Sequence, residues 1–212
     1  RAGRAGRVAP GRCFRLWSEA EQARKADFDP PECFRVDLAG AVLNLAAWGI
    51  TAPEGFRWLD APDPLVMQRA VNLLAALGAT EADGSLTDVG RRMTAFPLPP
   101  RLARLMAAGQ DEQCVVELAA IAALMQGEGV AMKGGLNDNL RDSADYTDFQ
   151  AEWRAVEKAV DAGFEAGACT RWGISARGAR EVWMAYRQLL SIGSRGKSRE
   201  MPEPDFTAAR PA

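Results

Sequence analysis

Apolar side chains recur at helical spacing along most of the chain, and Gly and Pro interrupt this pattern at short intervals. From Asp37 onward the apolar positions follow the i, i+3, i+4, i+7 spacing of one helix face. Asp37, Asp63, Thr87 and Ser175 are of the residue types that cap helix N-termini. The sequence therefore predicts a mainly α fold. The expected helices cover residues 37–48, 63–77, 87–96, 100–108, 111–125, 149–164 and 175–192.

The expected helices fall into two groups. Residues 35–108 combine three helices with a turn and a short strand near 79–87, which is the order of a winged-helix domain. Residues 109–192 contain helices alone, joined across a polar, Gly-rich stretch at 127–147 that predicts a long loop. The Gly, Ser, Arg and Pro of residues 193–212 predict a disordered tail.

The first 25 residues differ from the rest in charge. They hold seven basic and two acidic side chains, whereas the whole chain carries 26 Lys+Arg against 28 Asp+Glu. Arg1, Arg4 and Arg7 are separated by glycines, so planar guanidinium groups that match phosphate oxygens stand on a backbone that a ligand can approach. A disordered basic arm would have the same composition.

Residues 13–17, Cys-Phe-Arg-Leu-Trp, predict a short strand. No partner strand follows nearby, and unpaired backbone N–H and C=O groups need partners. Because the chain starts at Arg1 and not at Met, we expect a fragment or a processed product whose sheet lies upstream.

Composition excludes several kinds of site. The chain contains no His, which rules out His-based acid–base catalysis and His metal ligands. Its four cysteines are widely spaced without a C-x-x-C pair, so we expect reduced thiols in the cytoplasm and no metal site. No run of 18 apolar residues is present, so no membrane span is expected.

The amino-terminal segment resembles one family. Residues 1–17 read R-A-G-R-A-G-R, then Pro10-Gly11, then the predicted strand. This order resembles the end of the second RecA-like domain of DEAH/RHA-type superfamily 2 helicases, where motif VI, Q-R-x-G-R-x-G-R, precedes a P-G-x-[CA]-[FY]-R-L-[YW] strand. The leading Gln of the motif would stand just before Arg1.

Further patterns similar to that family follow in the same order. They are Arg35-Val36-Asp37-Leu38, Trp48-Gly49-Ile50, Phe56–Pro62, Leu73–Ala79, Leu86–Gly90 and Phe96–Arg101. The resemblance is specific over residues 1–125 and weak up to 192. Asp37-Leu38-Ala39 and Ala46–Gly49 are most similar to the bacterial HrpB-type members.

The resemblance implies a role at an ATP site. In this family ATP binds between two RecA-like domains, and motif VI arginines stabilise charge on the γ-phosphate. By motif position Arg4 and Arg7 would be these arginine fingers, with Gly3 beside the nucleotide. The sequence has no Walker A lysine loop and no D-E-x-H box, so a longer parent would bind ATP with Mg²⁺, and this chain alone should not hydrolyse ATP.

The resemblance also implies a winged-helix domain and a helical "ratchet" domain that close over single-stranded RNA without regard to sequence. The end of a RecA-like domain would occupy residues 1–25. Arg177, Arg180 and Arg187 lie within about 80° of one another on the last expected helix and are candidate phosphate contacts. A solvated helix face is the other interpretation of these arginines.

Two further hypotheses belong to other classes. The chain could be a free-standing winged-helix module that binds DNA through residues 87–96 and its basic arm, without ATPase activity. That helix carries only Arg91 and Arg92, with Asp88 beside them. The chain could also be a helical interaction domain with no nucleic-acid role.

Overall fold

The computed structural model describes residues 2–26, 28–142, 145, 147–194 and 204–206. The chain divides into two units, Arg1–Val36 and Asp37–Ala212. The described residues are mainly helical, which confirms the predicted class. Within them, extended backbone pairs only at two isolated antiparallel bridges, Thr80 with Leu86 and Ala131 with Ile174.

The first unit contains short helices. They are the 3₁₀ turn η1 (Ala2–Arg4), helix α1 (Glu19–Arg24) and the 3₁₀ turn η2 (Glu32–Phe34). A capping box starts α1, because Ser18 and Glu21 satisfy each other's backbone N–H groups. The strand predicted over residues 13–17 does not form among the described residues, and Phe14 and Leu16 are exposed there. No described segment offers this stretch a ladder of backbone partners, which a strand requires.

The second unit begins with the helices of the predicted winged-helix region. They are α2 (Ala39–Ala47), α3 (Pro64–Ala76) and α4 (Asp88–Met93), with the 3₁₀ turn η3 (Pro53–Gly55) after α2. Two predicted caps act as expected: the side chain of Asp63 accepts from the N–H of Leu65, and that of Thr87 from the N–H of Gly90. The cap predicted at Asp37 falls one residue later, at Leu38, although Oδ1 of Asp37 still accepts from the N–H of Ala39 at 2.8 Å. A bridge between Thr80 and Leu86 closes the turn before α4.

A helical bundle follows in the same unit. It contains α5 (Pro100–Asp111), α6 (Val115–Gln126), the 3₁₀ turn η4 (Asp138–Leu140), α7 (Asp148–Asp161), α8 (Ala166–Arg171) and α9 (Ala176–Gly193). The helix predicted over 149–164 ends earlier than expected, because the backbone turns left-handed at Gly163, with φ of 58°, directly after the C-cap Ala162, and Phe164 follows with φ of 59°. Glu165 then caps α8, a helix that the apolar spacing did not predict.

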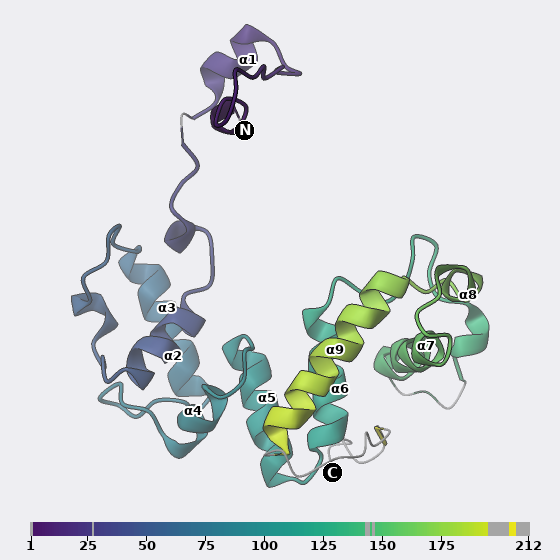
Figure 1. Ribbon diagram of the computed structural model, residues 1–212. Coiled ribbons are helices and arrows are strands. Elements are labelled where there is room, and N and C mark those ends of the chain that lie inside the picture. The colour runs from purple at the N-terminus through teal and green to yellow at the C-terminus, as the bar shows by residue number, and fades with distance from the viewer. Residues whose placement is uncertain (1, 27, 143–144, 146, 195–203, 207–212) are drawn as a thin grey trace. The chain divides into compact units, whose positions relative to one another are not determined.

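Helix α9 is the central element of the bundle, since it lies along α6 and also contacts α7 (Figure 1). Its buried face includes Val182, Tyr186 and Leu189. The ring of Tyr186 meets that of Trp153 on α7 edge to face, with centroids 4.7 Å apart. Trp153 is 3% exposed, so it belongs to the core.

The predicted disordered tail, residues 193–212, lies largely outside the described residues. Of its described part, Gly193 is the last residue of α9, and the backbone N–H of Asp205 donates to Oε1 of Glu117 at 3.2 Å. The side chain of Phe206 is buried.

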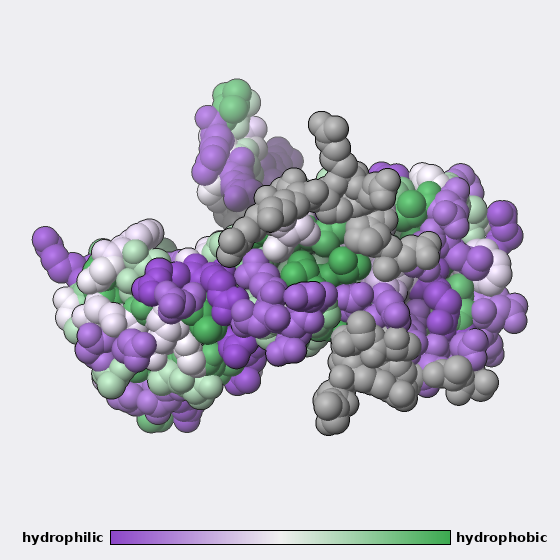
Figure 2. Space-filling view, turned by 90° about the horizontal axis from the view of Figure 1, so that it is seen from below, coloured by the Kyte–Doolittle hydropathy of each residue, from purple (hydrophilic) through white to green (hydrophobic). Residues whose placement is uncertain are grey.

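The surface in Figure 2 is mainly hydrophilic, with hydrophobic side chains in smaller patches. Among the described helices, none combines the length and the hydropathy that crossing a membrane requires. The same part of the chain contains no group of three or more Cys, Asp or Glu side chains arranged to hold a metal ion.

Two glycines provide a matched test of the packing around α4. A Cβ on Gly90 would lie 2.0 Å from the carbonyl oxygen of Ala79, whereas a Cβ on Gly40 in α2 would meet nothing closer than 4.0 Å. We expect Gly90→Ala to destabilise the protein by about 2–3 kcal/mol through overpacking. Gly40→Ala should leave stability unchanged or raise it by up to about 1 kcal/mol. Urea unfolding measures both, and equal midpoints for the two variants would contradict the packing around Gly90.

Candidate nucleic-acid interface

The amino-terminal site residues are accessible. Arg4 ends the turn η1, and the side chains of Arg4 and Arg7 are exposed. Neither guanidinium has an ion-pair partner among the described residues, and a Cβ on Gly3 would meet nothing within 4 Å. Two unpaired guanidinium groups and an open glycine backbone fit a phosphate ligand. This geometry is compatible with the predicted contact to ATP, which stays a prediction.

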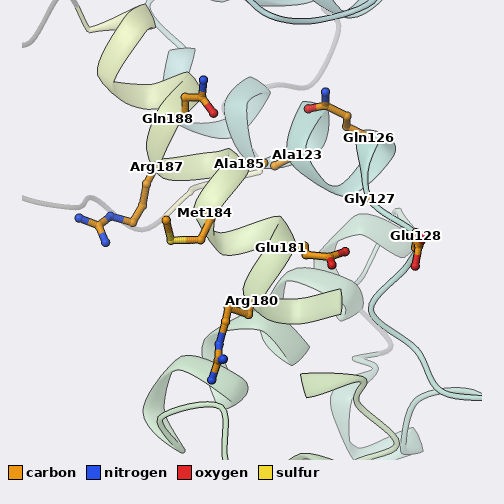
Figure 3. Close-up of a pocket in the computed structure, with 10 residues that line it drawn as sticks. All are labelled: Ala123, Gln126, Gly127, Glu128, Arg180, Glu181, Met184, Ala185, Arg187 and Gln188. Atoms are coloured by element: carbon orange, nitrogen blue, oxygen red, sulfur yellow. The ribbon is translucent and has the colours of Figure 1, made fainter. Parts of the chain in front are cut away.

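A groove of about 850 Å³ lies between the end of α6 and the outer face of α9 (Figure 3). From α6 and the residues after it come Ala123, Gln126, Gly127 and Glu128. From α9 come Arg180, Glu181, Met184, Ala185, Arg187 and Gln188. Two of the three arginines predicted on this helix therefore line one groove.

The α9 residues of the groove form two adjacent stripes. Arg180, Met184 and Arg187 are spaced i, i+4, i+7 and project from one side of the helix in Figure 3. Glu181, Ala185 and Gln188 have the same spacing one position later and lie on the side toward α6. The helix thus separates its cations from the carboxylate and the amide.

Arg177 differs from the other two arginines because carboxylates surround it. Its Nε donates to Oε1 of Glu181 at 2.8 Å, and its guanidinium lies 3.8 Å from Oε2 of Glu128. The hydrogen bond to Glu181, followed by the charges of both carboxylates, raises the pKa of Arg177. All three side chains are solvent-exposed, so these pairs contribute little to stability. The two carboxylates nevertheless offset the positive charge of Arg177.

Arg180 and Arg187 keep their charges available. The guanidinium of Arg180 lies over the ring of Phe164, with 5.1 Å between its Cζ and the ring centroid. A ring neutralises no charge, so the cation can still attract an anion. Arg187 has no ion pair with any other described residue.

The arginines of α4 are bound within the unit. Arg91 pairs with Asp88 and also donates to the carbonyl oxygen of Leu86 at 2.8 Å. Arg92 makes a two-pronged contact with Asp111 on α5, with distances of 2.6 and 3.0 Å. That contact raises the pKa of Arg92 and lowers the pKa of Asp111. A winged helix that read DNA through this element would first have to release these cations.

Sequence reasoning missed part of the groove. Gln188, Glu181 and Met184 could have been found, because each stands four residues from a predicted arginine or one position beside it on the same helix. Glu128 and Gln126 could not, since only the folded chain brings the end of α6 to α9. The buried Trp153 does not line the groove.

Part of the chain is similar to known proteins. Residues 70–98 match the family model for the helicase associated domain (HA2), winged-helix. Over 127 residues the chain is 39% identical to the probable ATP-dependent RNA helicase DHX35 homolog of Caenorhabditis elegans. Over part of its length the chain is therefore similar to the DEAH-box RNA helicases.

Both matches cover only part of the sequences compared. The winged-helix match runs from within α3 through α4 to the prolines before α5, inside the predicted domain of residues 35–108. The aligned segment covers 59% of this chain but only 17% of the length of the worm protein. The domain bounds, the motif VI residues and the RNA contacts predicted from sequence therefore stay predictions.

Proposed function

We propose that this DEAH-box relative is the C-terminal part of an ATP-dependent RNA helicase of the bacterial HrpB type that works in the cytoplasm. In this role it supplies motif VI arginines to an ATP site and a helical surface that holds single-stranded RNA. The observation that carries the proposal is the winged-helix region joined to a bundle whose central helix presents unpaired arginines beside a groove. The partners are RNA and the RecA-like domains of a longer chain.

The ATP site uses only part of this chain. Arg4 and Arg7, with Gly3, are free to meet the phosphates of a nucleotide held by the RecA-like domains. The sequence has no Walker A lysine loop and no D-E-x-H box, so the ligands of Mg²⁺ would come from the RecA-like domains of the longer chain. The contribution of this chain to hydrolysis is therefore positive charge at the γ-phosphate.

The RNA surface uses the outer face of α9. Arg180 and Arg187 attract phosphates, and such contacts track the backbone of a strand irrespective of its sequence. Arg177 forms an ion pair with Glu181, so it adds less to the attraction of phosphates. DNA reading by a free-standing winged helix receives less support, since both arginines of α4 are bound to Asp88 and Asp111.

Salt dependence of RNA binding tests the RNA surface. We expect Arg180→Ala and Arg187→Ala each to weaken binding of single-stranded RNA and to reduce the slope of log K against log salt concentration by about 0.7, the value for one phosphate contact. Arg177→Ala should leave the slope unchanged, as should the control Arg69→Ala on α3. Fluorescence anisotropy of labelled RNA at several salt concentrations gives the slopes. Unchanged slopes for Arg180→Ala and Arg187→Ala would reject the surface.

ATP turnover tests the arginine fingers. In a longer chain that carries the two RecA-like domains ahead of these residues, we expect Arg4→Ala and Arg7→Ala to lower kcat by roughly a thousandfold or more, the usual effect of losing an arginine finger. The control Arg12→Ala removes an exposed arginine of the same unit outside the motif. Residues 1–212 alone should give no turnover. An equal loss in all three variants, or turnover by residues 1–212 alone, would contradict the assignment.

A further inference from the structure

The groove between α6 and α9 has opposite charges on its two sides. Arg180 and Arg187 stand on the outer stripe of α9, whereas Glu181 and Glu128 stand toward α6 and the residues that follow it (Figure 3). A uniform phosphate-binding track would be cationic on both sides. This groove instead attracts phosphate along one edge and repels it from the other.

The cationic edge has the dimensions of a strand contact. Arg180 and Arg187 are seven residues apart, which corresponds to about 10 Å along the helix axis. Between them lies Met184, whose side chain is 57% exposed and offers an apolar surface that adapts to a neighbour. A nucleic-acid strand with its phosphates on this edge would direct its bases across Met184 into the groove.

The floor and far edge of the groove suit base edges. Ala123 and Ala185 are small and leave space between the helices. Glu181 and Glu128 are held together by Arg177, which contacts both carboxylates at 2.8 and 3.8 Å. An ionised carboxylate has acceptor capacity beyond one such contact and has no donor. The far edge therefore presents hydrogen-bond acceptors, and Arg177 lies between them.

We propose that this groove selects among bases: Arg180 and Arg187 bind the phosphates of single-stranded RNA, and Glu181 and Glu128 accept hydrogen bonds from the exocyclic amino groups of the bases. Arg177 is a positioning residue, because it orients the two carboxylates and touches no phosphate. This inference rests on the proposed function and refines it, since the binding of RNA then depends partly on sequence.

The chemistry of the bases gives the direction of the preference. Cytosine carries an N4 amino donor that a carboxylate can accept, whereas uracil has an O4 acceptor at the same position. An acceptor placed against a carboxylate forms no hydrogen bond with it, so uracil lacks the contact that cytosine makes. The groove should therefore favour cytosine over uracil.

Two pyrimidine homopolymers test the inference. Binding of oligocytidylate and oligouridylate of equal length to residues 1–212 is measured at neutral pH by fluorescence anisotropy. We expect Glu181→Gln to lower the ratio of the two affinities roughly tenfold or more, the effect of losing a hydrogen bond to a charged group. Arg177→Ala should lower the same ratio and leave the salt slope unchanged. Glu112→Gln makes the same change of charge at an exposed position outside the groove and should leave the ratio unchanged.

Methionine variants test where the bases lie. Met184→Ala should weaken binding of intact RNA but not of an abasic strand, since an abasic strand keeps only the phosphate contacts. Met125, also 57% exposed, lies on α6 outside the groove, so Met125→Ala is the matched control. Circular dichroism melting verifies that all variants fold.

The outcomes separate this inference from the proposed function. A cytosine-to-uracil ratio that is the same in Glu181→Gln, Glu112→Gln and the unchanged protein would overturn base selection. If Arg180→Ala and Arg187→Ala still weakened binding in that case, the RNA surface would stand. If these two variants had no effect on either homopolymer, the RNA surface itself would be rejected.

Discussion

Tyr186 lies fully buried where α9 meets α6 and α7, and the arrangement of the bundle depends on this contact. Its ring packs edge to face on Trp153, and Trp183 lies beside it with centroids 5.6 Å apart. Burial, and then the nearby charges of Glu117 and Glu157, raise the pKa of its hydroxyl, so the side chain stays neutral in the core. Because this face of α9 is fixed, the opposite face keeps a constant orientation.

That orientation determines which cations are available. The outer stripe of α9 presents Arg180 and Arg187 without carboxylate partners in the part of the chain that the structure describes, whereas Arg177, at the start of the helix, is paired with Glu181 and Glu128. On α4, which an independent DNA-binding winged helix would use, Arg91 and Arg92 already have carboxylate partners in Asp88 and Asp111. The distribution of ion pairs, more than the number of arginines, thus favours the bundle as the interface for nucleic acid.

Much of the fold could be predicted from local sequence, because caps and apolar spacing act over a few residues. Thr87 and Ser175 cap the helices they were expected to cap. Phe164 fitted the apolar stripe of α7 but lies beyond its end, because α7 stops before the left-handed Gly163 and the apolar spacing alone does not weigh this stop signal. The strand over residues 13–17 requires backbone partners that no described segment supplies. The contact between Arg177 and Glu128 depends on the path of the chain after α6, which spacing on one helix does not reveal.

Ultraviolet crosslinking of single-stranded RNA to residues 1–212, with the crosslinked peptides identified by mass spectrometry, tests the central claim most directly. The account predicts crosslinks on α9 between Arg180 and Gln188 and at the end of α6, near Gln126, since these residues line one groove. Crosslinks concentrated on α4 around Arg91 and Arg92, with none on α9, would contradict the account and would favour a free-standing winged-helix module instead.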